Sequence, residues 1–357
     1  MFGKINKGKR REWTYPLELL GDETQRLFES GLSKSDNQPL LAVLGEGENG
    51  EVVTLDLSQH SLMLLSGRAT GSGYHMGGNL FIASIMSHST PDQVNFAFID
   101  PSRTLDEFNN SPFLDPQAVH ISKESRGVLG DTQESISYLE WVWKEKNRRM
   151  ELLSQYEMSL SKFNEGVGKK RIPSEKMKPL IVVIDQYSTL NGMSSGKADE
   201  LIEKIGAYDT KEAGIHVILY TYDIYELKDR GLLSLITGRW IFKMRTPEDS
   251  KVVLGVQGAE DLKGYGDSYL YQEGDNELMR IQTPLSTPLI DPSTPFVMHT
   301  INEYLRESGG EKRSTIKRII KNSWDNGLIA NIILWWFFLT LVCSFAYIIY
   351  GIFEWFI

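Results

Sequence analysis

Two stretches of the sequence decide the fold. The first is LMLLSGRATGSGYHMGGNLFIASIMSH (62–88), in which an apolar strand-like run is followed by a glycine-rich turn and a helical pattern. The second is PLIVVIDQ (179–186), in which PLIVVID (179–185) is the most apolar strand-like run of the chain and ends in Asp185, with Gln186 after it. A glycine-rich turn between a buried strand and a helix is typical of a phosphate-binding loop. An acidic residue at the end of a second strand is the position from which such proteins hold Mg²⁺.

Strand-like and helical patterns alternate along the rest of the central region. We expect a hairpin from 40–45 and 51–57, buried strands at 94–100, 216–222 and 240–244, and helices at 131–158, 198–208 and 226–237. Nearly all-apolar strands that alternate with helices predict an α/β fold with a mainly parallel sheet and helices on both faces. Ligands of such sheets bind at the carboxyl ends of the strands, where the glycine-rich turn and Asp185 both lie.

The charge of the chain is unevenly distributed. Its 357 residues include 38 Lys and Arg, 47 Asp and Glu and one cysteine, for a net charge of −9. The single cysteine excludes an internal disulfide framework and multi-cysteine metal sites. Five basic residues lie in 1–11 and five more in 312–321. Without these ten, and without Asp325 and Glu354, 28 basic residues face 45 acidic ones, so the central body is near −17. We therefore expect double-stranded DNA to be at most a weak partner.

The C-terminal region predicts a membrane anchor. The stretch LIANIILWWFFLTLVCSFAYIIYGIF (328–353) holds 26 residues without a charge, and about 20 apolar helical residues span a bilayer. A buried core helix is the alternative, but no face of this helix would be polar. The basic residues of 307–327 precede the span and only Glu354 follows it. The positive-inside rule then places the body in the cytoplasm and residues 354–357 outside the cell membrane, as in a tail-anchored protein.

Several further motifs occur in a fixed order. They are STPDQVNFAFIDPSRTLDEF (89–108), FNEGVGKKRIPSEKMKPLIVVIDQ (163–186) and LLSLITGRWIFKMRTPEDSKVVLGVQGAEDLKGYGDSYLY (232–271). Together with the glycine-rich turn, they resemble the motor domain of the FtsK/SpoIIIE DNA translocases and of the related type VII secretion ATPases. The resemblance covers residues 39–306 and implies a RecA-like domain of the P-loop NTPase class, preceded by a basic leader at 1–38.

The resemblance also implies a site for ATP or ADP with Mg²⁺. The residues that match its positions are Arg68, Ala69, Thr70, Gly71, Ser72, Gly73, Tyr74, His75, Asp185 and Gln186. Asp185 would be the magnesium ligand if a nucleotide binds, and the backbone amides of 69–73 would contact its phosphates.

The sequence departs from the family pattern at the positions that carry the chemistry. Tyr74 stands at the lysine position of the loop, His75 at the Ser/Thr position, and Arg68 at the first glycine position. Gln186 replaces the catalytic glutamate, and an amide cannot act as a general base toward water. Tyr222 and Lys251 replace a glutamine and an arginine farther along the chain. Phosphoryl transfer depends on positioning and charge stabilisation, so we expect no catalytic residues here.

These departures predict a pseudo-ATPase that serves as a structural or regulatory subunit of a DNA- or protein-translocating machine. Its partner would be an active motor of the same kind or further copies of itself. Two alternatives remain open. The chain could be an active, membrane-bound DNA translocase in which Arg68, His75 or a residue of a neighbouring subunit replaces the lysine, or a nucleotide-sensing module without hydrolysis. A smaller prediction concerns the pair Arg148–Arg149, which could form an intersubunit contact or simply lie on a solvated helix face.

Overall fold

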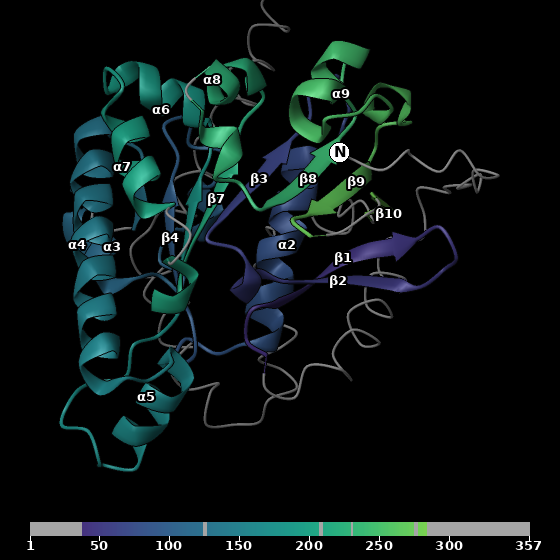
Figure 1. The fold of residues 1–357 in the computed structure, drawn as a ribbon. Coiled ribbons are helices and arrows are strands. Elements are labelled where there is room, and N and C mark those ends of the chain that lie inside the picture. Colours follow the sequence, from purple (N-terminus) through teal and green to yellow (C-terminus); the bar gives the residue numbers. More distant parts are fainter. Residues whose placement is uncertain (1–37, 124–126, 207–209, 230, 275–277, 284–357) are drawn as a thin grey trace, which may run out of the picture. The chain divides into compact units, whose positions relative to one another are not determined.

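The computed structural model describes residues 38–283 apart from 124–126, 207–209, 230 and 275–277 (Figure 1). Its strands form one sheet of ten in the order β2-β1-β10-β9-β8-β3-β7-β6-β4-β5. The strands from β8 to β5 are parallel to one another, whereas β9, β10, β1 and β2 continue the sheet in antiparallel pairs. The strand bounds are β1 (Leu41–Gly47), β2 (Val52–Asp56), β3 (Leu62–Ser66), β4 (Asn95–Ile99), β5 (Val128–Leu129), β6 (Leu180–Ile184), β7 (Ile215–Tyr220), β8 (Gly238–Phe242), β9 (Asp267–Gln272) and β10 (Met279–Gln282).

At least one helix follows each of the strands β3 to β8. The helices are α2 (Tyr74–His88), α3 (Pro116–Ile121), α4 (Thr132–Tyr156), α5 (Leu160–Gly168), α6 (Tyr187–Met193), α7 (Lys197–Ile205), α8 (Ile224–Asp229) and α9 (Pro247–Leu254). The expected mainly parallel α/β sheet is thus confirmed. The short helices α3, α5, α6 and α9 and the antiparallel strands β9 and β10 were not expected from the sequence.

Strand β3 lies at the centre of the sheet, between β7 and β8. All five of its residues are buried, as are all five of β6, which explains why both read as unbroken apolar runs. After β3 the chain crosses to β4 on one side and later returns to β8 on the other. The loop that follows β3 therefore lies where the strand order reverses, the usual place for a ligand in an open α/β sheet.

Helices cover the two faces of the parallel half. Helices α4 and α7 pack together over one face (Figure 1), where their apolar residues join a large core with β3, β6 and β7. On α4, Ile136, Leu139, Val142 and Leu153 are buried as expected, while Met150 is half-buried. Helix α2 lies on the opposite face, and its Phe81 ring packs 6.2 Å from that of Trp240 on β8.

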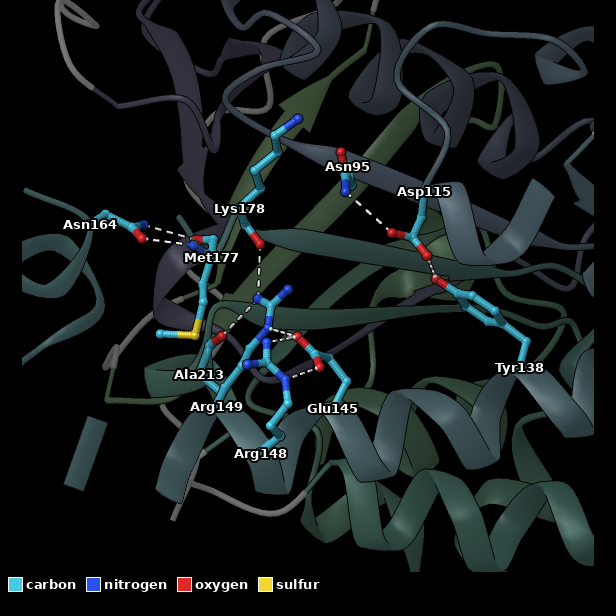
Figure 2. A network of polar contacts seen from close by, with 10 residues as sticks. All are labelled: Asn95, Asp115, Tyr138, Glu145, Arg148, Arg149, Asn164, Met177, Lys178 and Ala213. Atoms are coloured by element: carbon cyan, nitrogen blue, oxygen red, sulfur yellow. Dashed lines mark hydrogen bonds and ion pairs between the residues drawn. The ribbon is translucent and has the colours of Figure 1, made fainter. Parts of the chain in front are cut away.

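Arg149 ties α4 to the amino ends of two strands (Figure 2). Its Nη1 donates to the carbonyls of Lys178 at 2.8 Å and Ala213 at 3.0 Å, and its Nε donates to Glu145 at 2.8 Å. Arg149 is only 6% exposed, so the predictions of an intersubunit contact and of a solvated face are both wrong for it. Its neighbour Arg148 is exposed and also pairs with Glu145.

The expected C-terminal span at 328–353 lies outside the described residues. Within 38–283, apart from the gaps named above, no helix is long and apolar enough to cross a membrane.

Candidate functional site

The loop 67–73 follows β3 and leads directly into α2. Gly73 adopts a left-handed φ of 89° and precedes the first residue of the helix. A Cβ at Gly73 would lie 2.7 Å from the backbone nitrogen of Gly266. Only glycine fits there without a shift of the backbone, because both the φ value and the close approach exclude a side chain. The loop thus makes a tight turn from β3 into α2, and Gly73 is the residue that this turn requires.

Much of the loop backbone is already bonded within the protein. The amides of Arg68 and Ala69 both donate to the carbonyl of Lys243, at 3.1 and 3.0 Å. The amide of Ser72 donates to the carbonyl of Ala69 at 3.1 Å. On the other side, the carbonyl of Gly71 accepts from the amide of Tyr265 at 2.7 Å. Of the amides at 69–73 that the sequence assigned to phosphate, those of Ala69 and Ser72 are therefore engaged elsewhere.

Tyr74 fills the position at which the family pattern has lysine. Its side chain is only 9% exposed. Burial, followed by the negative charge of Asp185, raises the pKa of the Tyr74 hydroxyl to about 12, against a weaker opposing effect of a hydrogen bond with the Gln186 side chain. Tyr74 is therefore neutral at pH 7 and supplies no cation. The structure thus brings Tyr74, Asp185 and Gln186 together, as the sequence predicted for the two sides of the site.

Asp185 lies at the carboxyl end of β6 and is fully buried. Thr104 Oγ1 donates to its Oδ2 at 2.5 Å, and the backbone amide of Gln186 donates to its Oδ1 at 2.8 Å. His75 Nδ1 lies 3.8 Å from Oδ1. Burial raises the pKa of Asp185, the nearby Asp100 raises it further, and His75 and the Thr104 hydrogen bond oppose this shift. The donors to the Asp185 carboxylate are thus neutral, and the charged or titratable groups near it are the partly exposed imidazole of His75 and the carboxylate of Asp100.

Thr104 is a site residue that the sequence analysis missed. It follows β4 and links two buried carboxylates, because its hydroxyl contacts Asp185 and also lies 3.3 Å from Oδ2 of Asp100. Asp100 is held further by the amide of Leu105 at 2.6 Å. The available signal was the position of Asp100 at the end of a buried strand, in the run IDPSRT.

Arg68 is held by α8 and α9 rather than by the centre of the site. Its Nη1 lies 3.2 Å from Oδ1 of Asp249. Its guanidinium lies 5.5 Å from the ring centroid of Tyr222 and 5.1 Å from that of Tyr225, within the range of cation–π attraction. The Tyr225 hydroxyl donates to the same carboxylate oxygen of Asp249 at 2.9 Å. No local pattern indicates these contacts, since Asp249 lies 181 positions away along the chain.

The remaining sequence-predicted positions lie around this centre. Gln186 has a left-handed φ of 51° and precedes α6. Thr70 and Gly71 are exposed at the tip of the loop. Tyr222 is 47% exposed after β7, and Lys251 is exposed on α9.

The arrangement does not fit a nucleotide held for hydrolysis. A buried neutral phenol occupies the lysine position, and an imidazole stands where a hydroxyl would bind Mg²⁺. The carboxylate that would hold Mg²⁺ is already bonded to Thr104 and to a backbone amide. Arg68, the loop's own cation, is neutralised by Asp249. Within the described residues, no cluster of three or more His, Cys, Asp or Glu side chains could hold a metal ion.

Comparison with known proteins places the sequence beside DNA translocases. The profile of the FtsK/SpoIIIE family matches residues 25–257. The DNA translocase FtsK of Helicobacter pylori (strain J99) is 31% identical over 272 residues, which are 74% of this chain and 30% of that protein. The DNA translocase SftA of Bacillus subtilis (strain 168) is 27% identical over 270 residues, 73% of this chain and 26% of that protein. The chain thus matches about a third or less of the length of these relatives.

Solved structures share the fold. The cytoplasmic domain of the type VII secretion ATPase EccC of Thermomonospora curvata matches 77% of this chain and 32% of its own, with a TM-score of 0.56 and 22% identity. The conjugation coupling protein TcpA of pCW3, solved with ATPγS, matches 76% of this chain and 72% of its own, with a TM-score of 0.55 and 15% identity. Both confirm the ATPase-type sheet that the sequence predicted.

Proposed function

Because this chain belongs to the FtsK/SpoIIIE family, we propose that it is a membrane-anchored member of that family that has lost hydrolysis. It acts as a structural or regulatory subunit of a machine that translocates DNA or protein. The relatives include DNA translocases and, by fold, a type VII secretion ATPase, so either substrate class is compatible with the family.

The observation that carries the proposal is the buried Tyr74 at the loop's lysine position. A lysine there neutralises the β- and γ-phosphates, and a neutral phenol cannot replace that charge. Tyr74 also contacts Gln186, the residue at the position of the catalytic glutamate. The two departures therefore form a single contact across the site, which occupies space between the loop and the end of β6.

The substitute cations are poorly placed to restore activity. Arg68 forms an ion pair with Asp249 and cation–π contacts with two tyrosine rings. His75 faces Asp185 at 3.8 Å, so a protonated imidazole would pair with the carboxylate before it met a phosphate. This geometry weighs against the alternative of an active translocase that uses Arg68 or His75 in place of lysine.

The membrane anchor rests on the sequence. The uncharged stretch 328–353 is long enough to span a bilayer, and the basic residues before it favour a cytoplasmic body with the C-terminus outside. The partner is then an active motor of the same family or further copies of this chain. The acidic central region favours a protein partner over direct contact with double-stranded DNA.

The decisive experiment is an ATPase assay on the purified full chain, with and without double-stranded DNA. We expect no hydrolysis above the background of an Asp185→Ala variant. Turnover on the order of one per second that disappears in Asp185→Ala would overturn the proposal. Thermal stabilisation by Mg-ATP without turnover would instead support a nucleotide-sensing module. The variant Tyr74→Lys is the matched control, because it restores the cation and should increase any such stabilisation.

A further inference from the structure

Residues 158–178, here called the basic tip, form a small projection at one end of the described body. They comprise α5 and the loop that returns to β6. In Figure 1, α5 extends past the lower end of α4, whereas α6, α8 and α9 lie at the opposite end of the sheet. The basic tip is thus at the amino edge of the parallel strands, remote from the loop 67–73.

The basic tip has its own core and a defined shape. Phe163, Ile172 and Met177 are buried together with Leu153 of α4 in a cluster separate from the main core. The side chain of Asn164 holds the backbone of Met177 through two hydrogen bonds of 2.8 Å, one accepted and one donated (Figure 2). The projection is therefore a packed element with a defined backbone.

Its surface charge opposes that of the rest of the chain. The segment 158–178 contains six Lys or Arg and two Glu, a net charge of +4, which leaves −13 for the remainder. The exposed basic side chains of the segment are Lys162, Lys169, Lys170, Arg171 and Lys176. Of these, only Lys169 makes an ion pair with another described residue, Glu165.

Helix stability alone does not explain these cations. Lys169 and Lys170 follow the C-terminus of α5, where positive charge is favourable to the helix dipole. Lys162, however, lies in the first turn of the same helix, where a cation is unfavourable. Lys176 lies in the return loop, beyond the helix. The feature that Lys162, Lys170 and Lys176 share is exposure on one projecting element.

We propose that the basic tip docks on an anionic lipid surface. This inference rests on the proposed membrane anchor, which would keep the body close to a bilayer. A projecting tip can meet a planar surface while the acidic body stays away from it. Met158, 39% exposed at the start of the segment, adds an apolar side chain that the interface accepts.

A nucleic acid fits the same surface less well. Phe163 is fully buried and Tyr156, just before the segment, is half-buried, so no exposed aromatic ring offers a base-stacking platform. A duplex longer than the tip would also meet the acidic remainder of the chain. Four of the five exposed cations are lysines, point charges that suit a diffuse field of lipid headgroups.

The test uses the full chain in nanodiscs of phosphatidylcholine, with or without about 30% phosphatidylglycerol. Acetylation rates of individual lysines are measured by mass spectrometry. We expect Lys162, Lys170 and Lys176 to react about five- to tenfold more slowly in the anionic discs at 50 mM salt. This protection should disappear near 500 mM salt because the Debye length falls. The exposed lysines Lys144, Lys228 and Lys263, away from the tip, should react equally in both discs.

Variants give a second readout that does not depend on the anchor. The triple variant Lys162→Gln, Lys170→Gln, Lys176→Gln should partition onto anionic vesicles on the order of 100-fold less than the matched triple variant at Lys144, Lys228 and Lys263. If the chain is firmly anchored, the two triple variants are compared by the acetylation rate of Lys169, an exposed tip lysine that both retain; its protection by anionic discs should be lost in the first variant and kept in the second.

The outcomes distinguish a failure of the lipid docking by the basic tip from a failure of the proposed membrane anchor. Resistance to alkaline carbonate extraction reports the anchor alone, whatever the labelling shows. Equal labelling in the two kinds of disc overturns the docking even for an inserted chain. A chain that fails to insert still supports the docking if it floats with anionic vesicles in a salt-sensitive way through the three lysines, and overturns it if it does not float. Stronger protection by a 30-base-pair duplex than by anionic discs at the same salt assigns the surface to nucleic acid and overturns the lipid proposal.

Discussion

Buried charges are compensated differently at the two ends of the parallel strands, here called the amino edge and the carboxyl edge. At the amino edge, the guanidinium of Arg149 is met by the carboxylate of Glu145 and by two backbone carbonyls. At the carboxyl edge, Asp185 is fully buried beside neutral donors, with the partly exposed His75 3.8 Å away. Burial raises the pKa of Asp185, which means that its ionised form is disfavoured in the folded state.

The two edges differ in whether the buried charge is compensated by its surroundings. A buried charge that is fully compensated stabilises the elements it joins, whereas an incompletely compensated one costs stability. The amino edge is built as structure. The carboxyl edge places a glycine-bearing loop and the buried carboxylate of Asp185 side by side, with the neutral Tyr74 near that carboxylate.

The largest effect should come from Arg149→Met. This change leaves the carbonyls of Lys178 and Ala213 without their side-chain donor and removes the buried partner of Glu145, which keeps only the exposed Arg148. Breaking such a buried pair typically costs about 3–5 kcal/mol. Urea unfolding of the full chain measures the loss. The neighbouring Arg148→Met is the matched control, since Arg148 is exposed and should cost no more than about 1 kcal/mol. Equal losses for the two variants would mean that the buried Arg149 stabilises the fold no more than the exposed Arg148, and would contradict the structural role given to the amino edge.

The next effect concerns the backbone of the carboxyl edge. Gly73→Ala forces a side chain into a left-handed φ of 89° and against the backbone nitrogen of Gly266, so we expect a loss of about 3 kcal/mol. Gly231→Ala is the control, because Gly231 has a φ of 77° but no atom within 4 Å of the added Cβ. It should lose only about 1 kcal/mol, measured by the same unfolding experiment. A Gly73→Ala variant as stable as Gly231→Ala would mean that the loop yields easily and no longer keeps its shape.

A pH effect should arise at the amino edge from His216. Its Nδ1 lies 2.8 Å from the carbonyl of His60, and burial lowers its pKa from 6.5 to about 4. The unfolded chain therefore takes up a proton at a higher pH than the folded one, and stability falls as the pH drops from 6.5 toward 4. Between pH 7 and pH 5 we expect a loss of about 2 kcal/mol from this residue. The loss should be smaller by that amount in His216→Gln, and an unchanged pH slope in that variant would contradict the assignment.

The sequence predicted the parts of the fold that depend on local pattern. The runs 62–66 and 180–184 form buried strands inside the sheet because continuous apolar sequence has to be covered on both faces. The glycine-rich turn and Asp185 met at one edge because parallel strands end on the same side. The expected helix 131–158 is α4, with its bounds shifted by one and two residues.

The rest depends on contacts between distant residues, which no local pattern reports. Arg149 is charged and lies on a helix, so its burial could not be inferred without knowing where the amino ends of β6 and β7 lie. Thr104 became a site residue only because the β4 loop reaches the end of β6. Strands β9 and β10 are short and mix polar with apolar residues, and the prediction of a mainly parallel sheet did not include them.

The smallest expected effect tests the carboxyl edge most directly, and it comes from Asp185→Asn. Asparagine has the same shape without the buried charge, and the Thr104 hydroxyl can turn toward Asp100. We therefore expect the variant to be as stable as the natural chain, or up to about 1 kcal/mol more stable, at pH 7. Because the pKa of Asp185 is raised in the folded state, the penalty of its ionised form is present at pH 7 and fades as the pH falls toward 4, so any gain should shrink there.

The same substitution at Asp267 is the control, since Asp267 is buried against Arg280 with contacts of 2.9 and 2.7 Å and should lose about 3–5 kcal/mol. A loss above about 2 kcal/mol for Asp185→Asn would make this carboxylate as structural as Arg149, and the two edges would no longer differ.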